Sequence, residues 1–480
     1  MRGLTVRAVL FACTADLIPL YALYAMLFAD HGLSTAQISS LLAIWSATSF
    51  VLEIPSGAWA DTVSRRALLI GSAALLVAAF SCWTLFPSYA GFALGFVLWG
   101  ASGSLRSGTF EALLYDDLAA RSATASYPRI TGYVRAAAES GALVGILAAA
   151  PLYAWGGYPL IGWSSVAIAA VHTCTAAALP AAPKTVSARE IEDLADACLS
   201  DDGALPPAAS SPLRSGGGPS LASDGGEPLR SAAGPPLSSG RAEAPQTGGD
   251  PADSRAGVRY LRMLRLGLRE SLRVRMIRRG LLLAAMLNGI TAFDEYFALL
   301  AGNAGVAPSI TPLLVGLTVA GGLAGTALAG RTESMRPRTM AAALFLGGVL
   351  FIGGALLAGL AADHPDAVYV LTGVGFSAIG VAYGIDYNAE VVAAARLQDA
   401  IEGPARATVT SVGGFLTELL ALAVFGFVGL ASVWLPIPPT VALLGVPLLV
   451  IAALVPSWLP VRRDEAAAGS HDGGPIEAGP

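Results

Sequence analysis

The sequence is poor in charge and contains almost no lysine. Asp, Glu, Lys and Arg together make up 13% of its 480 residues, and Lys184 is the only lysine. Soluble domains carry about 25% charged residues, so the composition argues against a soluble multi-domain enzyme. The formal net charge of −5 gives no electrostatic basis for binding nucleic acid, and no nucleic-acid partner is predicted.

Cysteine and histidine are also scarce. The four cysteines are Cys13, Cys82, Cys174 and Cys198, and no two of them form a C-x-x-C pair. Three lie in apolar runs, where cysteine acts as a small buried side chain, and the histidines are equally scattered. We therefore predict no disulfide framework, no metal site and no cofactor. The sequence also has no phosphate-binding loop and no G-x-S-x-G motif, so an enzyme is not predicted.

Long apolar runs are what the chain has in abundance. Hydrophobic residues make up 54% of it, and its mean hydropathy is +0.62. A membrane-spanning helix needs about 20 apolar residues. The sequence predicts an all-α membrane protein with twelve transmembrane helices. The candidate spans cover roughly 6–28, 37–60, 67–86, 89–113, 129–152, 157–180, 280–302, 310–330, 338–360, 367–391, 407–432 and 437–459.

Arginine is distributed very unevenly across these spans. With the N-terminus inside, the cytoplasmic connections carry arginines such as Arg65, Arg66 and Arg336, and both tails carry more. The six outer connections contain no Lys or Arg. Cytoplasmic loops are enriched in basic residues, so both termini are predicted to be cytoplasmic.

A long connection divides the spans six and six. We predict an N-terminal bundle over 1–182, a disordered linker over 183–256 and a C-terminal bundle over 280–461, because the linker is rich in Gly, Pro, Ser and Ala. Residues 257–279 place leucines and arginines on separate helical stripes, which predicts a basic amphipathic helix on anionic membrane lipid. Residues 462–480 are predicted to be a disordered tail.

A motif after the second span carries a family resemblance. The stretch EIPSGAWADTVSRR resembles the signature G-x-x-x-D-R-x-G-R-R of the major facilitator superfamily. Its matching positions are Gly57, Asp61, Arg65 and Arg66. Thr62 stands where the signature has Arg, and Ser64 stands where it has Gly.

The resemblance implies two six-helix bundles around a central cavity, alternating access and a monomer. It also implies a cytoplasmic gate that closes the inner side. We expect this gate to contain Gly57, Asp61, Arg65, Arg66, Glu111 and Asp116.

Further motifs resemble bacterial drug exporters within that superfamily. They are Glu53-Ile-Pro55, Ser107–Asp117, Asp294-Glu295-Tyr296 and Arg406-Ala-Thr408. This resemblance implies export across the plasma membrane of a bacterium.

Several ionisable residues fall inside the predicted spans, where each costs about 3 kcal/mol on insertion scales. Asp16, Asp294 and Glu295 lie near the middle of spans 1 and 7, which correspond in the two halves. We predict that they couple protons to substrate, with Arg106 as counter-ion and Glu53 nearby. Glu53 and Glu139 are further candidate partners for Arg106.

The other intramembrane charges are predicted to form structural pairs between or along helices. Arg135 and Glu139 are four residues apart and share a helix face. The remaining members of this set are Asp386, Glu390 and Glu418.

Aromatic and amide side chains fall in spans that line the cavity in the resembling family. Tyr21 and Tyr24 are three residues apart and could stack on a planar substrate; contact with lipid is the alternative for each aromatic residue. The predicted cavity residues are Tyr21, Tyr24, Trp45, Trp99, Asn288, Tyr296, Tyr383 and Tyr387.

These features predict a secondary transporter whose partners are a small molecule, protons and membrane lipid. Burial favours the protonated form of a carboxylic acid, and a bound cation favours the charged form. Competition between the two at one site is antiport, which predicts proton-coupled export of a small, partly apolar or cationic molecule. Uptake of a metabolite by symport and a non-transporting scaffold or sensor remain alternatives.

Overall fold

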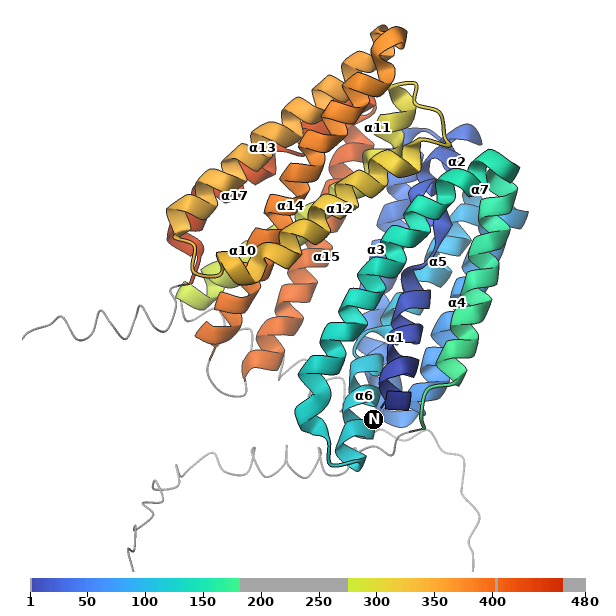
Figure 1. Ribbon diagram of the computed structural model, residues 1–480, viewed down its shortest axis with the longest axis vertical. Helices are drawn as coiled ribbons and strands as arrows, with labels where there is room; N and C mark the ends of the chain where they lie inside the picture. The colour runs from blue at the N-terminus through green and yellow to red at the C-terminus, as the bar shows by residue number, and fades with distance from the viewer. Residues whose placement is uncertain (1, 182–274, 402–404, 461–480) are drawn as a thin grey trace, which may run out of the picture. The chain divides into compact units, whose positions relative to one another are not determined.

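The computed structural model describes residues 2–181, 275–401 and 405–460 (Figure 1). The predicted linker 183–256 and tail 462–480 lie outside the described residues, as does the amphipathic helix up to residue 274. The described residues on either side of the predicted linker belong to one compact unit. Every regular element in the described ranges is helical, which confirms the predicted all-α class.

The N-terminal half consists of long helices interrupted by short 3₁₀ turns. Its elements are α1 (Arg2–Asp16), η1 (Pro19–Ala22), α2 (Tyr24–Asp30), α3 (Thr35–Thr62), α4 (Arg65–Leu85), α5 (Tyr89–Arg106), α6 (Thr109–Ala120), η2 (Thr124–Ser126) and α7 (Tyr127–Ala177). Ser34 and Gln37 form a capping box at the start of α3, which satisfies backbone N–H groups that the first turn leaves free.

The C-terminal half is built in the same way. Its elements are α10 (Arg275–Ile290), η3 (Thr291–Tyr296), α11 (Phe297–Asn303), α12 (Thr311–Thr332), α13 (Pro337–Leu360), η4 (Ala361–Asp363), η5 (Pro365–Ala367), α14 (Val368–Ala400), α15 (Ala405–Ala431), α16 (Ile437–Leu443) and α17 (Val446–Trp458).

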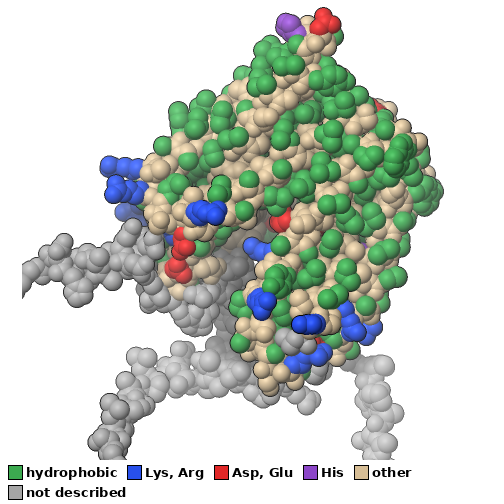
Figure 2. Space-filling model, viewed as in Figure 1, with side chains coloured by type: hydrophobic (Ala, Val, Ile, Leu, Met, Phe, Trp, Pro, Cys, Tyr) green, Lys and Arg blue, Asp and Glu red, His purple; other side chains and the backbone are tan. Residues whose placement is uncertain are grey.

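Ten segments of the described chain are long and apolar enough to cross a membrane. One of them, Thr124–Ala177, has 54 residues and bends at Gly156 and Gly157, where the backbone leaves helical geometry. In Figure 2, apolar side chains cover much of the surface, and basic side chains lie in the middle and lower parts of the view. The protein is a multi-pass membrane protein; the count of twelve spans and the cytoplasmic termini stay predictions.

Three predicted spans are interrupted rather than continuous. The first breaks between α1 and η1, where Ile18 is extended because the residue before a proline is disfavoured in helix. The seventh contains η3 between α10 and α11. The fourth, predicted over 89–113, ends at Arg106, since Gly108 has a φ of +67° and begins α6 in a left-handed conformation that glycine tolerates.

Glycine allows the closest helix contacts in the C-terminal half. Gly321 and Gly325 of α12 lie against the backbone of Gly380 and Gly384 in α14. A Cβ atom at Gly325 would overlap the carbonyl oxygen of Gly384. Small residues four apart are the usual device for such backbone approach in membranes.

Replacing Gly325 with alanine should therefore destabilise the protein by about 1–3 kcal/mol, the cost typical of overpacking. Thermal unfolding of the purified protein in detergent measures the effect. The matched control is Gly330→Ala in the same helix, because a Cβ there meets no atom within 4 Å. Equal unfolding midpoints for the two variants would contradict this account of the α12–α14 contact.

Candidate functional site

Three consecutive residues of η3 contact three different helices. Asp294 accepts a hydrogen bond of 2.6 Å from the Tyr383 hydroxyl of α14. Glu295 accepts one from the Tyr24 hydroxyl of α2. The Tyr296 hydroxyl lies 2.9 Å from Ser39 Oγ of α3.

The 3₁₀ geometry of η3 explains this divergence. With three residues per turn, neighbouring side chains point about 120° apart. Asp294 is thereby bound within the C-terminal half, while Glu295 and Tyr296 reach the N-terminal half. Within the described ranges, no arginine nitrogen lies within 4.0 Å of either carboxylate.

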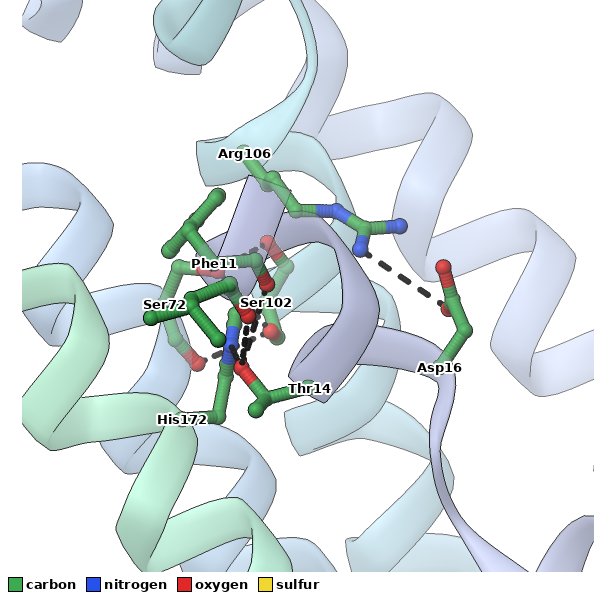
Figure 3. A network of polar contacts seen from close by, with 8 residues as sticks. Phe11, Thr14, Asp16, Ser72, Ser102, Arg106 and His172 are labelled. Carbon is green, nitrogen blue, oxygen red and sulfur yellow. Dashed lines mark hydrogen bonds and ion pairs between the residues drawn. The ribbon is translucent and has the colours of Figure 1, made fainter. Parts of the chain in front are cut away.

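Arg106 forms an ion pair with Asp16, its Nη1 lying 3.8 Å from Oδ1 (Figure 3). Asp16 ends α1 and Arg106 ends α5, so both side chains leave their helices where those helices stop. Their side chains are 30% and 39% exposed, which places the pair on a solvent-accessible surface between helices. Glu53, another predicted partner, instead accepts a hydrogen bond of 3.0 Å from Ser107 Oγ.

Aromatic rings form a stack beside this pair in the N-terminal half. Tyr21 stacks on Trp99 with ring centroids 4.9 Å apart and an interplanar angle of 11°. Trp45 stacks on Trp99 at 5.0 Å. Tyr24 is 3% exposed, and its ring contacts Trp83. Tyr21 lies in η1 and joins this ring stack. Tyr24 begins α2, and its hydroxyl donates to Glu295.

Three carboxylates that were predicted to form structural pairs, Glu418, Glu390 and Asp386, differ in their hydrogen-bond partners. Ser46 Oγ donates to Glu418 over 2.6 Å and joins α3 to α15. Asn288 Nδ2 donates to Glu390 over 2.5 Å. Asp386 is fully buried, and its oxygens have no hydrogen-bond partner among the described residues.

The expected ion pair between Arg135 and Glu139 is not formed within 4.0 Å. Both side chains are exposed. The i, i+4 spacing brought them to one helix face without bringing them into contact.

The hydroxyl of Tyr387, a residue also predicted for the cavity, lies 3.1 Å from the Tyr383 hydroxyl.

The arginines of the signature join α4 to neighbouring elements. Arg65 forms an ion pair with Asp116 of α6, and it donates to the Ala112 carbonyl over 3.3 Å. Arg66 donates to the Ala177 carbonyl at the end of α7. The side chains of Gly57 and Asp61 lie outside the described residues.

Glu111, the other predicted gate residue, lies exposed in the first turn of α6. The carboxylates that form ion pairs with arginine in this region are Asp116, which pairs with Arg65, and Asp117, which pairs with Arg121. Arg121 Nε lies 2.6 Å from Asp117 Oδ2, and this side-chain hydrogen bond raises the pKa of the Arg121 guanidinium. Sequence reasoning missed this second pair.

Sequence reasoning also missed several polar partners. Ser39 and Ser46 bind Tyr296 and Glu418 across the two halves. Thr14 Oγ1 lies 3.0 Å from Nδ1 of His172 (Figure 3), and His172 is 1% exposed. These residues are isolated in apolar runs and carry no spacing signal, because their partners are more than a hundred residues away.

Two helical halves that meet at broken helices, with carboxylates at the breaks, have the build of a membrane transporter. A sequence model of the Major Facilitator Superfamily matches residues 8–395. The chain belongs to this superfamily. It is therefore a transporter and not an enzyme.

Solved structures share this fold at low sequence identity. A point mutant of the nucleoside transporter NupG matches with a TM-score of 0.60 and 11% identity over 94% of this chain and 98% of its own. A D-xylose–proton symporter matches with a TM-score of 0.57 and 15% identity over 95% of this chain and 97% of its own. A POT family transporter in complex with 5-aminolevulinic acid matches with a TM-score of 0.59 and 13% identity over 95% of each chain. A search of curated protein sequences found no match.

The Asp16–Arg106 pair should contribute little to stability. Its atoms are 3.8 Å apart and its side chains about a third exposed, and exposed pairs contribute roughly 0.2–1 kcal/mol. A double-mutant cycle with Asp16→Asn and Arg106→Gln, followed by thermal unfolding, should give a coupling energy in that range. A coupling of about 3 kcal/mol, as for a buried pair, would mean a fixed structural bridge.

Proposed function

We propose that the protein exports a small, partly apolar cation in exchange for protons, by alternating access between its two halves. The observation that carries this proposal is the pair of neighbouring carboxylates, Asp294 and Glu295, on the broken helix between the halves. Each accepts a tyrosine hydroxyl, and neither has a basic partner in the described part of the chain.

A tyrosine partner suits a carboxyl group that changes its charge. The phenolic hydroxyl donates to a carboxylate, and its oxygen accepts from a carboxylic acid. Tyr383 and Tyr24 can therefore stay in place while Asp294 and Glu295 bind and release protons. An arginine partner would instead hold a carboxylate permanently charged.

The charges near this site favour a cationic substrate. Arg106 and Asp16 compensate each other, which leaves the negative charge of Asp294 and Glu295 without compensation. The Tyr21–Trp99–Trp45 stack supplies ring faces, which attract cations. A cation and a proton then compete for the same carboxylates, and an inward proton gradient drives the cation outward.

Alternating access requires the contacts between the halves to break and re-form. In this structure they include Tyr24 with Glu295, Ser39 with Tyr296, and Ser46 with Glu418. One of these contacts, Tyr24 with Glu295, involves a carboxylate of η3, so protonation there replaces a charge-assisted hydrogen bond between the halves with a weaker neutral one. This supports direct coupling between proton binding and conformational change.

The proposed orientation has both termini in the cytoplasm of a bacterium, with Arg65 and Arg66 on the inner side. It rests on the arginine distribution across the spans. In the alternate state, Gly57 and Asp61 with Arg65 and Arg66 would close the inner gate. Asp116 would then exchange its present contact with Arg65 for contacts across the gate.

Asp294→Asn should abolish proton-linked transport while leaving folding intact, because asparagine keeps the hydrogen bond from Tyr383 but binds no exchangeable proton. The assay uses everted membrane vesicles with an acidic interior and a pH-sensitive dye. A panel of aromatic cations, neutral compounds and anions is added, and a compound that collapses the gradient only with the wild-type protein supports the proposal.

The matched control is Asp30→Asn. Asp30 also accepts a tyrosine hydroxyl at 2.6 Å, from Tyr158, but it is exposed at the end of α2. This variant should transport as the wild type does. Equal proton-linked transport by Asp294→Asn, or proton-driven accumulation of a compound inside cells, would contradict the proposed antiport.

A further inference from the structure

An apolar groove of about 660 Å³ lies between α12, α13 and α14, within the C-terminal half. Small residues of α12, among them Ala320 and Ala324, form one wall, and α13 contributes Met340 and Ala343 to the other. Residues of α14 form the floor. The lining side chains that carry polar groups are Thr332, Ser377 and Asn388.

This groove is separate from the candidate transport site. On α14 it is lined by Val381 and Asn388, whereas Tyr383 and Tyr387 belong to the contacts around Asp294. At about 100° per residue, Asn388 points about 100° away from Tyr387, and Val381 about 160° away from Tyr383. The two sites therefore use different faces of the same helix.

The dimensions of the groove match a hydrocarbon chain. Its lining runs along α12 from Leu317 to Thr332, which is about 22 Å at 1.5 Å per residue. Half of a bilayer's hydrocarbon core is about 15 Å. The groove thus reaches from the end of α12 through the depth of one leaflet.

The rim of the groove is apolar and exposed. Leu317, Leu328 and Val381 have exposed fractions of 41%, 46% and 54%. In a membrane-spanning protein such a surface faces lipid tails. The polar side chains of the adjoining cavity already have protein partners: Thr332 donates to Asn388, Asn388 to the Gly325 carbonyl and Ser377 to the Gly373 carbonyl, so they do not need water. An acyl chain fills this space without leaving any polar group unpaired.

Three arginines flank in sequence the lining residues at the end of the groove where α12 gives way to α13. Arg331, Arg336 and Arg338 are exposed, and they flank the lining residues Thr332, Met335 and Met340 in sequence. Arg396 of α14 donates to the carbonyl oxygens of Glu333 and Met335 at 2.7 Å each. These bonds fix the connection between α12 and α13, on which Arg336 lies.

We propose that this groove binds an anionic phospholipid, with one acyl chain between α12 and α13 and the phosphate at Arg331, Arg336 and Arg338. The apolar walls select a lipid chain, and the three arginines select a negative headgroup over a neutral one. Because α12 and α13 pack on α14 rather than closely on each other, the chain fills the gap between them.

The test measures lipid binding to the purified full-length protein in detergent. Phosphatidylglycerol and phosphatidylcholine with identical acyl chains are titrated, and bound lipid is counted by native mass spectrometry. Phosphatidylglycerol should bind the wild-type protein more tightly. Exchanging all three arginines for glutamine should weaken that binding about 100-fold.

Two variants fill the groove from opposite walls. Ala324→Phe and Ala343→Leu should each lower binding of both lipids at least about tenfold, while thermal unfolding without lipid verifies folding. The matched control is Ala327→Phe, an exposed position on the same helix that does not line the groove. It should bind lipid as the wild type does.

Equal binding of the two lipids by the wild type would overturn the arginine assignment. Undiminished binding by both groove-filling variants would overturn the groove as the acyl-chain site. Neither outcome depends on transport activity, so this proposal stands or fails separately from the proposed antiport.

Discussion

A backbone in lipid must satisfy its own hydrogen bonds, and this constraint decides where the helices of this protein can break. Two apolar segments that are long enough to cross a membrane are interrupted by a 3₁₀ turn: η1 lies between α1 and α2, and η3 lies between α10 and α11. Such breaks are stable only where protein or water covers the freed backbone groups. The interruptions therefore lie against neighbouring helices, at the meeting place of the two halves.

The polar chemistry of the protein is concentrated at these two breaks. Asp16 ends α1 and contacts Arg106 at the end of α5, and Tyr21 follows in η1. Asp294 and Glu295 lie in η3 and accept hydroxyl groups from opposite halves. A continuous helix would present two adjacent carboxylates about 100° apart; the tighter 3₁₀ turn separates them further and lets each reach a tyrosine.

Much of the fold was predictable because it follows from local composition. The apolar runs predicted the membrane helices, and the signature around Asp61 and Arg65 predicted the superfamily. The mid-span positions of Asp16 and Asp294 singled them out on insertion cost alone. The interruption at Pro19 also has a local signal, since Ile18 before it cannot continue a helix comfortably.

The site's contacts were not predictable because they join residues distant in sequence. Tyr24 with Glu295 and Ser46 with Glu418 depend on how the halves pack, and no spacing rule reports this. The i, i+4 rule for Arg135 and Glu139 gave a shared face, but the two side chains form no ion pair within 4.0 Å. The Asp117–Arg121 pair follows the same rule and does form, which shows that spacing permits a pair without ensuring it.

The central claim is that a cation and a proton compete for the carboxylates of η3. Isothermal titration calorimetry of an aromatic cation binding to the purified protein tests it most directly, when repeated in buffers of different ionisation enthalpy. The account predicts that the binding heat varies with the buffer because cation binding releases protons, and that this variation is lost in Asp294→Asn. Cation binding with the same heat in every buffer would contradict it.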